Sequence, residues 1–119
     1  MTVQQCYEAF GGNYDEVLSR LRADDRIIRF LKMALSDGSY QLLVDSIDTN
    51  NAEEAFRAAH TLKGVCGNLS ITRLGESSSA LCEYLRDKRV IDDTVMSMLP
   101  KVKEDYTLTI NAIKQLIQQ

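Results

Sequence analysis

The 119-residue sequence has no tryptophan, a single proline and a single histidine, and its three cysteines lack the CxxC spacing of metal and redox motifs. One histidine with Cys6, Cys66 and Cys82 does not make a plausible zinc set, so we expect no metal and no cofactor of the protein's own. An odd number of scattered cysteines is typical of reduced, buried thiols.

Nucleotide-binding motifs are also missing from the sequence. It contains no GxxxxGKS/T loop, no kinase glycine loop and no GxGxxG fingerprint. We therefore expect that the protein does not phosphorylate itself from ATP. Any chemistry that it performs should depend on the active site of another protein.

Basic residues are outnumbered, because 14 Lys and Arg stand against 17 Asp and Glu, for a formal net charge of −3. No basic stripe stands out, which argues against nucleic acid or an anionic membrane as a partner. No stretch approaches the roughly 18 apolar residues of a membrane span, and the first residues lack the features of a signal peptide. We expect a soluble, cytoplasmic monomer.

The sequence does have helical periodicity. Its 45% of hydrophobic residues are enough for one compact domain with a core, and 119 residues are too few for two domains. Apolar residues recur at three- and four-residue spacing and no strand pattern is found, which predicts an all-α fold. We expect short helices within residues 1–22, broken at Gly11 and Gly12, and longer helices over residues 24–119. The last helix keeps its apolar phase across Pro100, so we predict one helix with a kink there, and a break into two helices is the alternative.

Residues 51–69 contain the histidine and are rich in Ala, Leu and Glu, with Asn50 or Asn51 as a candidate cap, so they predict a helix. At about 100° per residue, one side of this helix carries small and apolar residues, and the other side carries His60. The first side consists of Ala55, Ala58, Ala59, Leu62, Val65, Cys66 and Leu69. The opposite side consists of Glu53, Phe56, Arg57, His60, Lys63, Gly64 and Gly67. We therefore expect His60 to face solvent.

Two glycines lie on the predicted His60 side, and each costs about 1 kcal/mol relative to alanine inside a helix. Close helix packing cannot explain Gly64 and Gly67 on an exposed side, so we infer that another macromolecule approaches it closely. The missing side chains clear a path to the imidazole, and Lys63 places a cation beside it. This combination favours phosphoryl chemistry on His60. On the residues alone, a structural or ordinary surface histidine stays open as the alternative.

Residues 59–64 (AHTLKG), with small residues after them and Asn68-Leu69 closing the helix, resemble the signature of histidine-containing phosphotransfer (HPt) domains. HPt domains are helical bundles of about this length, so the resemblance covers most of the chain. It implies a single HPt-like domain over residues 1–119. Residues 24–119 would form an antiparallel up-down four-helix bundle, with short extra N-terminal helices in residues 1–22. The family commonly has Gly-Ala after Asn-Leu, whereas this chain has Ser70-Ile71.

The resemblance also bears on residues 24–47. Asp37-Gly38 is a strong turn dipeptide, and the residues alone predict two helices on either side of it. HPt domains usually have one long helix at this place. Following the resemblance, we predict one helix from Asp24 to Ile47, at most kinked at Gly38.

The resemblance implies a role for each residue of the motif. His60 would accept a phosphoryl group and carry it between receiver-domain aspartates in a two-component phosphorelay. Lys63 would stabilise the phosphoryl charge, and Gly64 would give steric access. The protein would then be a phosphoryl carrier rather than a free-standing enzyme.

The partners implied by the resemblance are response-regulator receiver domains and a hybrid sensor kinase, with magnesium held by the receiver. Exposed aromatic and arginine residues are enriched at interaction surfaces, so Phe56 and Arg57 are predicted to bind the partner, together with Gly67 and Asn68. Partial cover of Phe56 by a neighbouring helix is the alternative.

Three other functions remain open. A helical adaptor could use the HPt fold to bind receiver domains or kinases without carrying phosphate. The dimerisation and phosphoacceptor domain of a sensor kinase typically has an acidic residue directly after its histidine, where this chain has Thr61. A small enzyme with His60 as general base would need a nucleophile or carboxylate that the sequence does not place.

Overall fold

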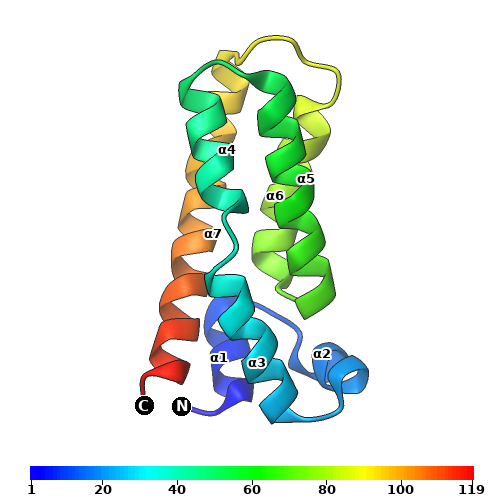
Figure 1. Ribbon diagram of the computed structural model, residues 1–119, viewed down its shortest axis with the longest axis vertical. Helices are drawn as coiled ribbons and strands as arrows, with labels where there is room; N and C mark the ends of the chain where they lie inside the picture. The colour runs from blue at the N-terminus through cyan, green and yellow to red at the C-terminus, as the bar shows by residue number, and fades with distance from the viewer.

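The computed structural model describes residues 1–119 and contains helices but no strands (Figure 1). In chain order the helices are α1 (Val3–Phe10), α2 (Tyr14–Leu21), α3 (Asp24–Leu35), α4 (Ser39–Asp48), α5 (Ala52–Leu69), α6 (Thr72–Leu85) and α7 (Asp93–Ile117). The predicted all-α fold is confirmed.

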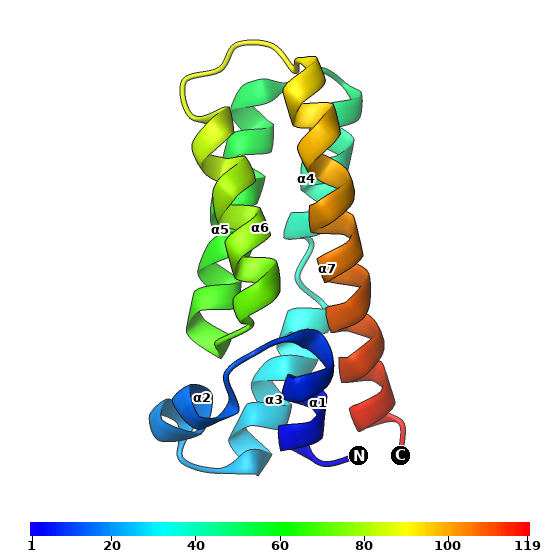
Figure 2. The same ribbon diagram turned by 180° about the vertical axis from the view of Figure 1, so that it is seen from behind.

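The longer helices form an antiparallel bundle (Figures 1 and 2). α4 packs against α5, α5 against α6, and α6 against α7. α3 and α4 follow one another along the length of α7 and together fill the fourth position of the bundle. Tyr40 of α4 stacks on Tyr106 of α7, with 3.9 Å between the ring centroids. The predicted up-down four-helix bundle with short extra N-terminal helices is therefore confirmed.

The prediction of one helix over residues 24–47 was wrong. α3 ends at Leu35, and α4 begins at Ser39. Asp37 explains the break, because its Oδ1 accepts a hydrogen bond of 2.9 Å from the backbone N–H of Ser39. This bond satisfies one of the free donors at the start of α4, so the turn is stabilised locally. A side chain at Gly38 would meet nothing within 4 Å, which means that packing does not impose the turn.

The N-terminal helices lie where they were predicted, in residues 1–22, and close one end of the bundle (Figures 1 and 2). Thr2 caps α1 and forms a capping box with Gln5, while Gly11 ends α1 in the left-handed conformation (φ 73°). The Asn13 side chain caps α2 by accepting from the backbone N–H of Glu16 at 3.0 Å. α1 packs against α7, and α2 packs against α3.

α7 is continuous through Pro100, as predicted, and the proline lies on its exposed side. The predicted kink stays a prediction. Asp92 begins the helix, because its Oδ1 accepts from the backbone N–H of Val95 at 3.1 Å. Its other carboxylate oxygen accepts from the Tyr84 hydroxyl at 2.6 Å, which joins the start of α7 to α6 and lowers the pKa of Asp92.

One cluster of buried apolar side chains fills the interior of the bundle. Among its largest members are Tyr7, Phe10, Leu31, Leu81 and Ile113, which come from four different helices. All three cysteines are buried and unpaired, as predicted. None of the helices combines the length and the apolar character that crossing a membrane requires.

Candidate functional site

α5 carries the histidine, and its two sides are divided as predicted. The Asn51 side chain caps the helix by accepting from the backbone N–H of Glu54 at 3.1 Å, and acidic residues occupy the first turn, where the helix dipole favours them. The predicted core side is buried except for Val65, which is half-buried. The buried members are Ala55, Ala58, Ala59, Leu62, Cys66 and Leu69.

His60 is exposed on the opposite side of α5, as predicted. Its aromatic neighbour is Phe56, one turn earlier, with 6.1 Å between the ring centroids and 43° between the ring planes. An imidazole in its neutral form is a competent nucleophile near pH 7, and here the ring is open to an approaching partner.

Gly64 and Gly67 are both exposed, and a Cβ atom added to either would meet nothing within 4 Å. Gly75 of α6 is a useful contrast, because a Cβ atom there would lie 3.2 Å from the Cβ of Cys66. Gly75 therefore serves the close packing of α6 on α5, whereas Gly64 and Gly67 serve no packing inside the domain. The prediction that internal packing does not explain these two glycines is confirmed.

Lys63 is half-buried and lies one turn beyond His60, on the edge of α5 that faces α6. It lines a polar groove between the two helices, which we name the α5–α6 groove, and Glu83 of α6 lines the same groove. The pKa of Glu83 is lowered, mainly by a hydrogen bond from Arg86 and to a smaller extent by the charge of Lys63. Lys63 thus has a carboxylate near it as well as the histidine.

Phe56 is half-buried rather than fully exposed, so the alternative of partial cover by a neighbouring helix is correct. Arg86, directly after α6, covers the ring, with its guanidinium carbon 5.1 Å from the ring centroid. Sequence reasoning missed Arg86 and Glu83, because the charged run that begins at Arg86 looks like an ordinary solvated helix end. Only the antiparallel packing of α6 on α5 brings this run to Phe56.

Arg57 is exposed, as predicted, but local ion pairs engage it. Its guanidinium contacts Glu53 at 2.7 Å and Glu54 at 3.3 Å, both on the preceding turn of α5. Exposed pairs of this kind contribute little to stability, so a partner can take over the guanidinium at low cost. Arg57 therefore remains available for binding.

Arg20 of α2 holds the end of α5 and was not predicted. Its guanidinium donates to the backbone oxygens of Gly67 at 3.1 Å and Asn68 at 2.8 Å, and to the Ser70 hydroxyl at 2.6 Å. Glu16 completes this cluster by pairing with Arg20 at 3.3 Å and accepting from Ser70 at 2.7 Å. The cluster satisfies carbonyls that the end of a helix leaves free. The four-residue spacing of Glu16 and Arg20 was the only sequence signal of it.

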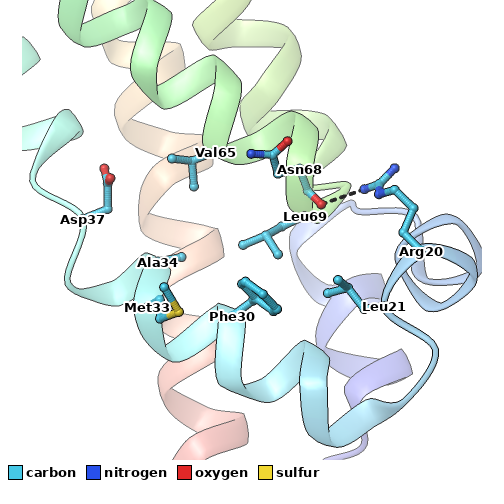
Figure 3. A pocket seen from close by; sticks show the side chains of 9 residues that line it. All are labelled: Arg20, Leu21, Phe30, Met33, Ala34, Asp37, Val65, Asn68 and Leu69. Atoms are coloured by element: carbon cyan, nitrogen blue, oxygen red, sulfur yellow. Dashed lines mark hydrogen bonds between the residues drawn. The ribbon is translucent and has the colours of Figure 1, made fainter.

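An apolar groove of about 530 Å³ lies beside Asn68, between α3 and α5 (Figure 3). In this view Phe30 and Met33 of α3 lie below Val65 and Leu69 of α5, and Arg20 stands at the α2 end of the groove. Phe30 is 39% exposed and Met33 is 61% exposed, which are high values for large apolar side chains. Sequence periodicity did not predict this groove.

The chemistry available to this site is that of an exposed nucleophile with a cation and open space beside it. No three His, Cys, Asp or Glu side chains come together closely enough to hold a metal ion. The expectation that the protein has no cofactor of its own stays a prediction. The exposed members of the predicted site, His60, Gly64, Gly67 and Asn68, lie along one side of α5, with Lys63 at its edge.

A family model described as the Hpt domain matches residues 25–119. The matched range runs from the first turn of α3 through α7, includes the whole of α5, and leaves α1 and α2 outside. Comparisons with curated proteins and with solved structures found no match. Members of the matched family are helical bundles that take part in histidine phosphotransfer in two-component phosphorelays, where they interact with receiver domains and kinases. The chain belongs to the Hpt domain family.

Proposed function

We propose that this protein carries a phosphoryl group on His60 between the aspartates of two receiver domains. The observation that carries the proposal is the open space beside the imidazole, where Cβ atoms at Gly64 and Gly67 would meet nothing within 4 Å. An exposed histidine alone would not need this space. A receiver domain that must bring its aspartyl phosphate to the ring does need it, because phosphoryl transfer requires near-attack distances.

In the proposed reaction, the unprotonated ring nitrogen of His60 attacks the phosphorus of the receiver's aspartyl phosphate. The N–P bond forms as the P–O bond to the aspartate breaks, and the aspartate leaves as a carboxylate with the electron pair. The second ring nitrogen keeps its proton, so the phosphorylated ring is a cation that carries an anionic phosphoryl group. The reverse reaction delivers the group to the next receiver.

Lys63 is proposed to stabilise the phosphoryl charge on His60. Lys63 lies one turn beyond His60 on the same helix, so its cation is near the place where a phosphoryl group on the ring would carry its charge. Replacement of Lys63 by Gln should slow transfer or shorten the lifetime of the phosphohistidine. The magnesium ion that transfer uses is proposed to be held by the receiver.

The receiver is proposed to dock on the side of α5 from Phe56 to Asn68, with Arg57 and Gly67 inside the contact. A hybrid sensor kinase is the proposed source of the phosphoryl group, passed on through its own receiver domain. We propose that the protein works in the cytoplasm, in keeping with three unpaired, buried cysteines.

The test is to incubate the protein with a receiver domain phosphorylated with labelled phosphate. We expect label that is labile in acid and stable in base, and that is absent from His60→Gln. Failure of the wild type to take label from any of several receivers would refute phosphotransfer. If the same receivers still bound, the adaptor function would be favoured.

The role of Gly64 is tested by Gly64→Leu, which should fold normally and transfer much more slowly. Thr107→Leu is the matched control, because it adds the same side chain to an exposed position of α7, diagonal to α5 in the bundle. Equal transfer rates for the two variants would contradict the steric argument.

A further inference from the structure

Glu83 and Arg86, at the end of α6, lie near the residues one turn before and one turn after His60 on α5. Glu83 and Arg86 form an ion pair of 3.0 Å with a second contact of 3.1 Å through the Arg86 Nε. Arg86 lies over the ring of Phe56 at 5.1 Å, and that ring is 6.1 Å from the imidazole. The guanidinium is therefore separated from His60 by a single aromatic side chain.

Glu83 also shares the α5–α6 groove with Lys63, which follows His60 by one turn of α5. Both residues line the α5–α6 groove, and the charge of Lys63 contributes to lowering the pKa of Glu83. The same carboxylate thus attracts two cations, one from α5 and one from the end of α6. Lys63 is itself part of the proposed phosphotransfer site, and Arg86 covers Phe56 of that site.

We propose that Glu83 is a positioning residue that engages Lys63 and Arg86 while His60 is unphosphorylated, and so lowers the equilibrium occupancy of the phosphohistidine. This inference rests on the proposed function of His60. A phosphoryl group carries more negative charge than a carboxylate and competes with Glu83 for the same two cations. Phosphorylation of His60 must weaken the attraction of the two cations to Glu83, and the free energy of this attraction opposes phosphorylation.

The consequence suits a relay intermediate, which has to give its phosphoryl group away as readily as it accepts it. A site that bound the phosphoryl group with both cations free would retain it. Glu83 offsets part of that attraction. The equilibrium constant for phosphoryl exchange with the receiver therefore lies closer to one. The effect is electrostatic, and the charged groups are partly exposed to solvent. It should therefore weaken as salt is added.

The test compares Glu83→Gln with Glu76→Gln, which makes the same charge change two turns earlier on α6 in the same groove. The measured quantity is the equilibrium ratio of phosphorylated to unphosphorylated His60 at a fixed ratio of phosphorylated to unphosphorylated receiver. We expect Glu83→Gln to shift this ratio toward the phosphohistidine by about two- to fivefold, the range for a partly exposed charge pair. Glu76→Gln should leave it near the wild-type value.

An equilibrium ratio separates this role from docking and from folding. A residue that only helps the receiver to dock, or only supports α6, changes the forward and reverse rates together and leaves the ratio unchanged. A Glu83→Gln ratio equal to that of Glu76→Gln, with normal labelling of the wild type, would overturn the inference and leave the proposed function intact. Absence of label on the wild type would overturn both.

A second measurement tests whether Glu83 acts through the two cations. In a background that carries Lys63→Gln and Arg86→Gln, the further change Glu83→Gln should shift the ratio by less than half of its original effect. A full shift in that background would overturn the proposed route. Melting temperatures of all variants show whether each retains the fold.

Discussion

Gly64 leads to a prediction in which stability and function change in opposite directions. Glycine inside a helix costs about 1 kcal/mol relative to alanine. A Cβ at Gly64 would meet nothing within 4 Å, so Gly64→Ala introduces no clash that could offset the gain. We therefore expect Gly64→Ala to raise the free energy of unfolding by about 1 kcal/mol.

The corresponding rise in melting temperature is about 4 °C for a domain of this size, since unfolding entropy scales with chain length. Gly67→Ala should have the same sign but a smaller effect, because Gly67 lies in the last turn of α5, where helices fray. Both variants should transfer phosphate more slowly than the wild type, because the added methyl group stands on the proposed path to His60.

The assay is urea denaturation followed by circular dichroism, with Gly75→Ala as the control. A Cβ at Gly75 would lie 3.2 Å from the Cβ of Cys66, so α5 and α6 must shift by a few tenths of an ångström to accept it. We expect Gly75→Ala to lose stability despite the same gain in helix propensity, since overpacking typically costs about 1–3 kcal/mol. A destabilised Gly64→Ala, or a stabilised Gly75→Ala, would refute the division between an open side and a packed side of α5.

Three further predictions concern stability and reactivity. Tyr7→Phe should lower the free energy of unfolding by about 1–2 kcal/mol in urea denaturation, because it removes the buried 2.7 Å hydrogen bond from the tyrosine hydroxyl to the backbone oxygen of Leu69; an unchanged midpoint would contradict it. Burial raises the pKa of the Cys66 thiol to about 12, so a thiol reagent at pH 8 should label this residue only after denaturation, and rapid labelling of the folded protein would show that it is accessible. Hydrogen bonds from Ser70 and Arg20 lower the pKa of Glu16, so its contribution to stability is present above its unfolded pKa and is lost as the pH falls through the folded value. Glu16→Gln should accordingly reduce the loss of stability between about pH 5 and pH 3, and an identical pH profile would argue against the cluster.

The fold and the orientation of α5 could be predicted because both depend on local periodicity. The spacing of apolar residues over 51–69 identifies the exposed side of the helix, and the structure agrees for His60, Gly64 and Gly67. The break between α3 and α4 was also present in the residues, as Asp37-Gly38. The family expectation of one long helix displaced that local signal, and the Asp37 hydrogen bond to Ser39 shows that the local signal was correct.

The surroundings of the site could not be predicted, because they depend on contacts between distant parts of the chain. Arg86 reaches Phe56 only after α6 has packed antiparallel to α5, and Arg20 reaches Asn68 only after α2 has folded back to the end of α5. The turn after α5 shows the same limit. Ser70 adopts a left-handed conformation (φ 54°) and ends α5, held by partners from α2 that its sequence neighbours do not reveal.

The packing of α1 on α7 has a consequence for synthesis of the protein. α1 precedes all the other helices along the chain, yet it packs against α7, whose last turns contain the buried side chains Ile113 and Leu116. At about 5–20 residues per second, α1 waits on the order of ten seconds with its apolar side uncovered. The core can close only after α7 has been made and has left the ribosome tunnel. The bundle therefore completes its folding when α7 emerges rather than helix by helix.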